Sequence, residues 1–104
     1  MDLVFVYMTA ASREEAARIG RALVEERLAA CVNILGGMTS IYRWEGAVET
    51  AEETVFIAKT RRDLFEPLAA RVRELHSYSV PCIVELPVER GNPAYLDWLR
   101  AETA

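Results

Sequence analysis

The chain has 104 residues, 52% of them hydrophobic and 27% charged, so we expect residues 1–104 to form one folded domain rather than a disordered segment. Its formal net charge of −4 disfavours a nucleic-acid partner. No apolar run approaches the ~18 residues of a membrane span, and the N-terminus lacks the basic start of a signal peptide. Two cysteines are too few for a disulfide framework, and we expect a soluble intracellular protein without a membrane partner.

The first part of the chain predicts a strand and a helix. Residues 3–8 form an apolar run rich in β-branched and aromatic side chains, which is typical of a strand covered on both faces. Ser12 and Glu15 have the spacing of a capping box, and apolar residues recur at helical spacing behind them. This pattern predicts a helix over residues 13–28.

The middle of the chain predicts a long β-hairpin. A strand over residues 30–35 meets a glycine bend at residues 36–37 and resumes with alternating polarity over residues 39–44. A tight turn at residues 45–46 then leads to a return strand over residues 49–60. The distal half of this hairpin is too long to pack on the core of so small a domain. Tyr42 and Trp44, on one face of that half, should therefore be covered by something outside the chain.

The last part of the chain predicts a helix, a short strand and a terminal helix. Apolar spacing indicates a helix from residue 64 to His76, although Pro67 should delay its start or bend it. A connector over residues 77–81 leads to a strand over residues 82–86. Asn92 followed by a proline is typical of a helix start, which predicts a short helix ending near residue 100.

This order of elements is that of an α+β, ferredoxin-like βαββαβ sandwich with an extended hairpin and a short C-terminal helix. Right-handed crossovers place both main helices on one face of a sheet with strand order 4-1-3-2. The other face then lacks cover within the chain, although the strands supply apolar residues to it. An exposed apolar face of that area marks an interface, so we expect an obligate oligomer whose hairpin reaches onto a neighbour.

Motifs for catalysis are scarce, and we expect no enzyme. The chain has one histidine, no Gly-x-Ser-x-Gly motif and no glycine in the turn after the first strand that could cradle a phosphate. Cys31 and Cys82 should lie on opposite edge strands, ~14 Å apart, too far to form a disulfide or share a metal within one chain. Across an interface between edge strands they could approach each other and favour copper or zinc; alternatively, both are core cysteines.

Other polar residues have two interpretations each. His76 ends the second main helix, as a solvated capping residue or as part of a site. Glu53 and Lys59 share a face of the third strand, and cross-strand ion pairs are their simpler role. Tyr42 and Trp44 favour interface packing over a ligand platform.

The residues together resemble the divalent-cation tolerance family, CutA. The segments that carry the resemblance are Glu26-Arg-Leu-Ala-Ala-Cys-Val-Asn-Ile34, Ser40-Ile-Tyr-Arg-Trp-Glu-Gly46, Lys59-Thr60, Leu75-His-Ser-Tyr-Ser-Val-Pro81 and Tyr95-Leu-Asp-Trp98. The resemblance implies a PII-like, cytoplasmic homotrimer that serves tolerance to divalent cations, copper especially, without a defined catalytic activity. It also implies that copper or another divalent cation is bound between subunits and is not required for folding.

Site residues carry over by position. Cys31, His76 and Tyr78 match family positions associated with metal binding or the intersubunit cleft, and Glu53 and Lys59 resemble polar residues of that cleft. Where the family commonly reads His-Pro-Tyr-Glu-Val-Pro-Glu, this chain reads His-Ser-Tyr-Ser-Val-Pro-Cys over residues 76–82, which removes two carboxylates and makes the site more thiol-like. The expected metal ligands are Cys31, His76 and Cys82; the expected cleft residues are Glu53, Lys59 and Tyr78; Tyr42 and Trp44 are expected at the trimer interface.

Two other functions compete with metal tolerance. A PII-like signalling module would bind a small anionic metabolite in the same clefts, with Lys59 and Arg43 as charge partners. A small enzyme such as an acylphosphatase needs an arginine in the loop after the first strand, which residues 9–12 do not supply.

Overall fold

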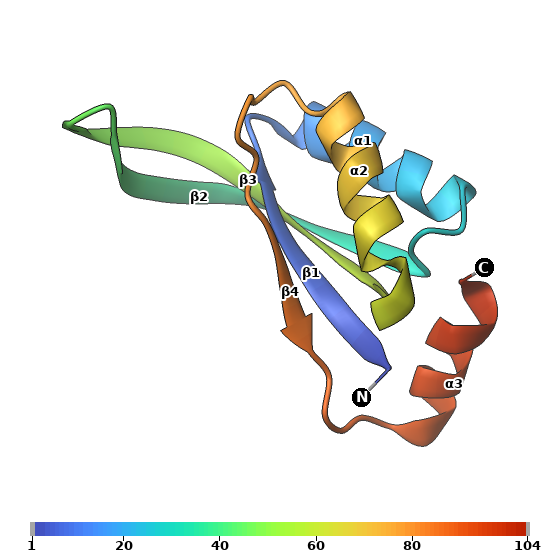
Figure 1. Cartoon of the computed structure of the whole chain (residues 1–104). Coiled ribbons are helices and arrows are strands. Elements are labelled where there is room, and N and C mark those ends of the chain that lie inside the picture. The colour runs from blue at the N-terminus through green and yellow to red at the C-terminus, as the bar shows by residue number, and fades with distance from the viewer. Residues whose placement is uncertain (1, 104) are drawn as a thin grey trace.

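The computed structural model describes residues 2–103 as a four-stranded antiparallel sheet with helices (Figure 1). The elements in chain order are β1 (Leu3–Ala10), α1 (Arg13–Glu25), β2 (Cys31–Trp44), β3 (Ala47–Arg61), a 3₁₀ turn (Arg62–Leu64), α2 (Phe65–Leu75), β4 (Ile83–Pro87) and α3 (Pro93–Glu102). The strands lie in the order β2-β3-β1-β4, which confirms the predicted ferredoxin-like α+β fold. No helix among these residues is both long and apolar enough to cross a bilayer.

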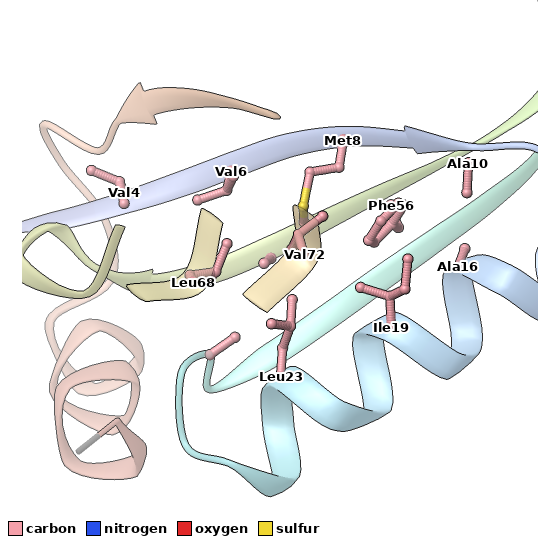
Figure 2. Close-up of a cluster of buried hydrophobic side chains, with 12 residues drawn as sticks. Val4, Val6, Met8, Ala10, Ala16, Ile19, Leu23, Phe56, Leu68 and Val72 are labelled. Carbon is pink, nitrogen blue, oxygen red and sulfur yellow. The ribbon is translucent and has the colours of Figure 1, made fainter. Parts of the chain in front are cut away.

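The core lies between the sheet and the two longer helices, α1 and α2 (Figure 2). Alternate residues of β1 point into it because side chains of a strand alternate between its faces, and those of α1 enter it at helical spacing. The fully buried side chains that fill it include Val4, Val6, Met8, Ile19, Leu23, Phe56, Leu68 and Val72. The remaining residues of each strand therefore point to the opposite face of the sheet.

Two helix boundaries differ from those expected. The first helix, α1, ends at Glu25 rather than near residue 28, because Arg27 adopts a left-handed backbone conformation with φ of 62°. The N–H groups of Leu28 and Ala29 then bond to the carbonyl of Leu23 and close the helix. Helix α2 begins at Phe65, so Pro67 falls in the first turn, where its missing N–H has no helical partner to lose.

The β2–β3 hairpin projects beyond the helices, as expected from its length (Figure 1). Its two strands stay paired from Cys31 opposite Lys59 to Trp44 opposite Ala47. A bulge between Leu35 and Met38 interrupts the register, where Gly36 and Gly37 predicted a bend. Beyond this bulge, no helix of residues 2–103 packs against the distal part of the hairpin (Figure 1).

The sheet face opposite α1 and α2 retains large apolar side chains in contact with solvent. They are Leu35, Tyr42 and Trp44 on β2 and Val84 and Leu86 on β4. Helix α3 covers one end of this face, where its Leu99 packs against Leu3 of β1. The expectation that this face lacks cover within the chain holds for most of the face but not for the end that α3 covers.

Candidate ligand-binding cleft

A cleft of about 370 Å³ lies between the distal hairpin and the connector that joins α2 to β4. It brings together residues from β1, both arms of the hairpin and the connector. Its lining consists of Thr9, Tyr42, Trp44, Glu53, Tyr78, Ser79, Val80 and Cys82. A larger hollow of about 450 Å³ beside Asp2, Arg61, Arg62 and Asp63 offers no thiol or aromatic side chain, and Arg61 pairs there with Asp63. The carboxylate of Glu53, the thiol of Cys82 and the aromatic side chains lie together in the first cleft.

Glu53 and Tyr78 join the two walls of the cleft. The Tyr78 phenol donates a hydrogen bond of 2.7 Å to Oε2 of Glu53. Burial, and next this hydrogen bond to a carboxylate, raise the pKa of Tyr78 from 10.0 to about 12. Tyr78 therefore remains a protonated donor at neutral pH. The other carboxylate oxygen of Glu53, Oε1, accepts no hydrogen bond from residues 2–103.

His76 lies behind the cleft. It is the C-cap of α2, as one of its two interpretations had it, but it is buried and not solvated. The N–H of Tyr78 donates to Nδ1 of His76 at 3.0 Å, which leaves Nε2 to donate to the carbonyl of Thr9 at 2.8 Å. The ring is covered because the connector folds back over the ends of β1 and α1. With both ring nitrogens engaged, His76 anchors the connector in this conformation.

Glu15 supports the connector from the other side. Its N–H donates to Ser12 Oγ at 3.1 Å, which confirms Ser12 as the helix cap. Its carboxylate accepts from the N–H of Ala11 at 3.1 Å and from that of Ser77 at 2.7 Å, instead of bonding back to Ser12 as a capping box would. Burial acts to raise the pKa of Glu15, but these hydrogen bonds and nearby His76 outweigh it and lower the pKa below 4.5.

Cys82 and Cys31 lie at separate places on the sheet. Cys82 is half-buried in the cleft, and burial together with the charge of Glu53 raises the pKa of its thiol. Cys31 begins β2, on the opposite edge, and its sulfur lies 3.8 Å from the Tyr95 hydroxyl. The two thiols are both free, and they belong to opposite edges of the sheet as expected.

Lys59 belongs to the neighbourhood of Cys31 and not to the cleft. Its Nζ donates to the Tyr95 hydroxyl at 3.0 Å and lies 5.1 Å from the centre of the Phe5 ring. Six residues of β3 separate it from Glu53, about 20 Å at strand spacing. Neither side chain forms an ion pair within residues 2–103, so the cross-strand pairing expected for Glu53 and Lys59 was wrong.

The candidate site residues therefore form two groups. Glu53, Tyr78 and Cys82 meet in the cleft, beside Tyr42 and Trp44 and in front of His76, whereas Cys31 and Lys59 lie with Tyr95 at the far end of the sheet. Within residues 2–103, no three His, Cys, Asp or Glu side chains are arranged to hold a metal ion. One chain by itself supplies a cleft with a carboxylate and a thiol but no complete metal centre.

Sequence patterns do not indicate the parts played by Thr9, Glu15 and Tyr95. The spacing of Glu15 predicts only a capping role, and its bond to Ser77 connects segments far apart in the chain. Tyr95 lies within a segment that carries the family resemblance, which is the one available signal for it.

The chain is thus a small ferredoxin-like domain with a polar and aromatic cleft and a partly uncovered sheet face. Residues 4–102 match the family model described as CutA1 divalent ion tolerance protein, and the chain belongs to this family. It is 54% identical over 98 residues to the divalent-cation tolerance protein CutA of Thermus thermophilus, covering 94% of this chain and 95% of that protein.

Solved structures agree with this assignment. A divalent cation tolerance protein (Cut A1) from Thermus thermophilus superimposes with a TM-score of 0.96 at 52% identity, over 98% of this chain and 99% of that one. A CutA structure from Archaeoglobus fulgidus gives a TM-score of 0.94 at 45% identity, over 96% and 97% of the two chains. The Archaeoglobus protein is described as periplasmic, so the cytoplasmic location expected for this chain stays a prediction.

Proposed function

We propose that this protein is a homotrimeric divalent-cation tolerance protein that binds copper in clefts between subunits and has no catalytic activity of its own. The observation that carries this proposal is the composition of the cleft. Glu53 is its one charged lining residue, and Cys82 adds a soft donor next to it. A pocket with a carboxylate, a thiol and no basic lining group favours a positively charged ligand.

The uncovered sheet face supports the trimer. Side chains such as Leu35, Val84 and Leu86 form an apolar surface that water would otherwise contact. Both edges of the sheet, β2 and β4, also lack a neighbouring strand among residues 2–103. A head-to-tail contact between two different edges closes into a ring when the rotation allows it, and a ring of three accords with the family resemblance.

Assembly also supplies what one chain lacks as a metal site. A contact between the β2 edge of one subunit and the β4 edge of the next brings the strand that starts at Cys31 toward the connector that holds Cys82. Thiolates select copper over hard cations such as magnesium. Because the pKa of Cys82 is raised, copper must displace its proton, and binding should strengthen as the pH rises.

An anionic metabolite has less support as the ligand. Lys59 lies about 20 Å from Glu53 along β3. Arg43 points away from the cleft, because it alternates with Tyr42 and Trp44 along β2. Within one chain, neither proposed charge partner faces the carboxylate.

Copper binding can be measured by titrating Cu(I) without oxygen against a competing chelator. We expect saturable binding that weakens at least tenfold in Cys82→Ser, with Mg²⁺ binding absent. Unchanged affinity in both Cys82→Ser and Cys31→Ser would overturn the proposed copper site. Thermal stabilisation by a nucleotide in place of copper would favour the signalling module instead.

A further inference from the structure

The cleft has a polar end that presents an unsatisfied acceptor. Tyr78 occupies Oε2 of Glu53, while Oε1 accepts no hydrogen bond and pairs with no cation within residues 2–103. A half-buried carboxylate with a free oxygen is a strong acceptor for a charged N–H donor. This end of the cleft is therefore suited to an ammonium or guanidinium group.

The other end of the cleft is aromatic and apolar. Tyr42 and Trp44 lie two residues apart on one face of β2 and are 42% and 48% exposed. Val80 of the connector, also in the lining, is 70% exposed. Tyr42 is four residues further along the hairpin than Met38, the partner of Glu53, so the backbone positions of the two ends lie about 13 Å apart. The aromatic surface thus offers stacking area to a body larger than a metal ion.

From this division we infer that the cleft binds an elongated organic cation, with its ammonium or guanidinium head at Glu53 and its apolar body on Tyr42 and Trp44. The volume of about 370 Å³ falls within the range of small-molecule sites. Aromatic faces attract cations as well as apolar surfaces, so both walls favour the same class of ligand. All named contacts come from one chain; in the proposed trimer a neighbour closes the open side.

This ligand class goes beyond metal tolerance and does not depend on copper. A metal ion would contact the carboxylate of Glu53 and the thiol of Cys82 but make no use of the aromatic side chains of Tyr42 and Trp44. Binding of the organic cation needs no thiol. The variant Cys82→Ser should therefore still bind the organic cation but bind copper more weakly. Failure of one proposal is in this way distinguishable from failure of the other.

The test is calorimetric titration with three probes of matched shape: 4-phenylbutylammonium, 4-phenylbutyrate and 4-phenyl-1-butanol. We expect saturable binding of the ammonium probe, and affinity at least tenfold weaker for the alcohol and the carboxylate. Glu53→Gln keeps an acceptor for Tyr78 but removes the charge, and should weaken the ammonium probe about tenfold or more. Trp44→Leu should weaken it several-fold through lost stacking.

Glu52→Gln is the matched control, because Glu52 neighbours Glu53 on β3 but faces the opposite side of the hairpin, where its carboxylate accepts from Thr39. This variant should bind the ammonium probe with the affinity of the parent chain. Circular dichroism identifies any variant that fails to fold, and Trp44→Leu then tests the aromatic end independently of Glu53. Equal binding of the three probes, no saturable binding at millimolar concentration, or unchanged affinity in Glu53→Gln would each overturn the inference.

Discussion

The carboxylate of Glu15 accepts a 2.7 Å hydrogen bond from the N–H of Ser77, a residue 62 positions further along the chain. This bond fixes the first turn of α1 to the connector that forms one wall of the cleft. His76 anchors the same connector to Thr9, and Tyr78 anchors it to Glu53. The shape of the cleft consequently depends on buried polar contacts between distant segments.

Replacement of Glu15 by Gln should destabilise the fold. The amide offers one acceptor oxygen where two backbone N–H groups now bond, so one N–H of these part-buried bonds loses its partner. We expect the free energy of unfolding at pH 7 to fall by about 1–3 kcal/mol, measured by urea denaturation.

The same residue predicts a pH dependence. The pKa of Glu15 is lower in the folded state than its ordinary 4.5, so the stability it contributes is present above pH 4.5 and is lost as the pH falls through the folded pKa. Glu15→Gln lacks this contribution, and its stability should decline less steeply in acid. A variant with the stability and acid profile of the parent chain would contradict this role.

Tyr78 should ionise at a higher pH than an ordinary tyrosine. Its phenol ionises at about pH 12 instead of 10.0 because burial and the hydrogen bond to Glu53 disfavour phenolate. Its contribution to stability is therefore complete below pH 10 and is lost as the pH rises toward 12. Ultraviolet titration of the folded protein should show a phenol that ionises near pH 12 and is missing in Tyr78→Phe. A titration curve that Tyr78→Phe leaves unchanged near pH 12 would be inconsistent with this hydrogen bond.

Cys82 should react slowly with thiol reagents at neutral pH. Burial and the Glu53 charge raise the pKa of its thiol, and the thiolate is the reactive form. Glu53→Gln removes the charge and should accelerate labelling of Cys82, monitored by mass spectrometry in a Cys31→Ser background. The matched variant Glu52→Gln should leave the rate unchanged, and an equal acceleration in both would rule out the proposed effect of Glu53.

A charge placed on the uncovered sheet face should disrupt assembly. Val84 is 49% exposed in the single chain, so Val84→Lys disturbs little within the subunit but brings a charge into the proposed interface. We expect light scattering to show loss of the trimer. Val24→Lys, on α1 and remote from that face, is the control and should assemble like the parent chain. A Val84→Lys protein with undiminished mass would place the interface elsewhere.

The order of elements could be predicted from the sequence because it depends on local periodicity. The apolar run of β1 and the helical spacing after Ser12 are properties of neighbouring residues, and strand order follows from crossover handedness. The end of α1 could not, because Arg27 adopts a left-handed conformation that its residue type does not favour. The effect of Pro67 depends on where α2 begins, and local spacing does not define that position to within one turn. With the start at Phe65, Pro67 lies in the first turn and neither delays nor bends the helix.

The sequence identified several residues of the candidate site but not the contacts that these residues make with one another. Glu53, Tyr78 and Cys82 were named, and the structure brings them together. Lys59 was grouped with Glu53 because they share a strand face, but the distance along β3 separates them. The burial of His76 results from the return of the connector over β1, a long-range contact that no local pattern encodes.

The mass of the protein in dilute solution tests the central claim most directly, since clefts between subunits require an assembly. Sedimentation equilibrium at micromolar concentration should give about 35 kDa, three times the 11.7 kDa of one chain. A folded particle of 11.7 kDa under the same conditions would contradict the trimer and, with it, copper binding between subunits.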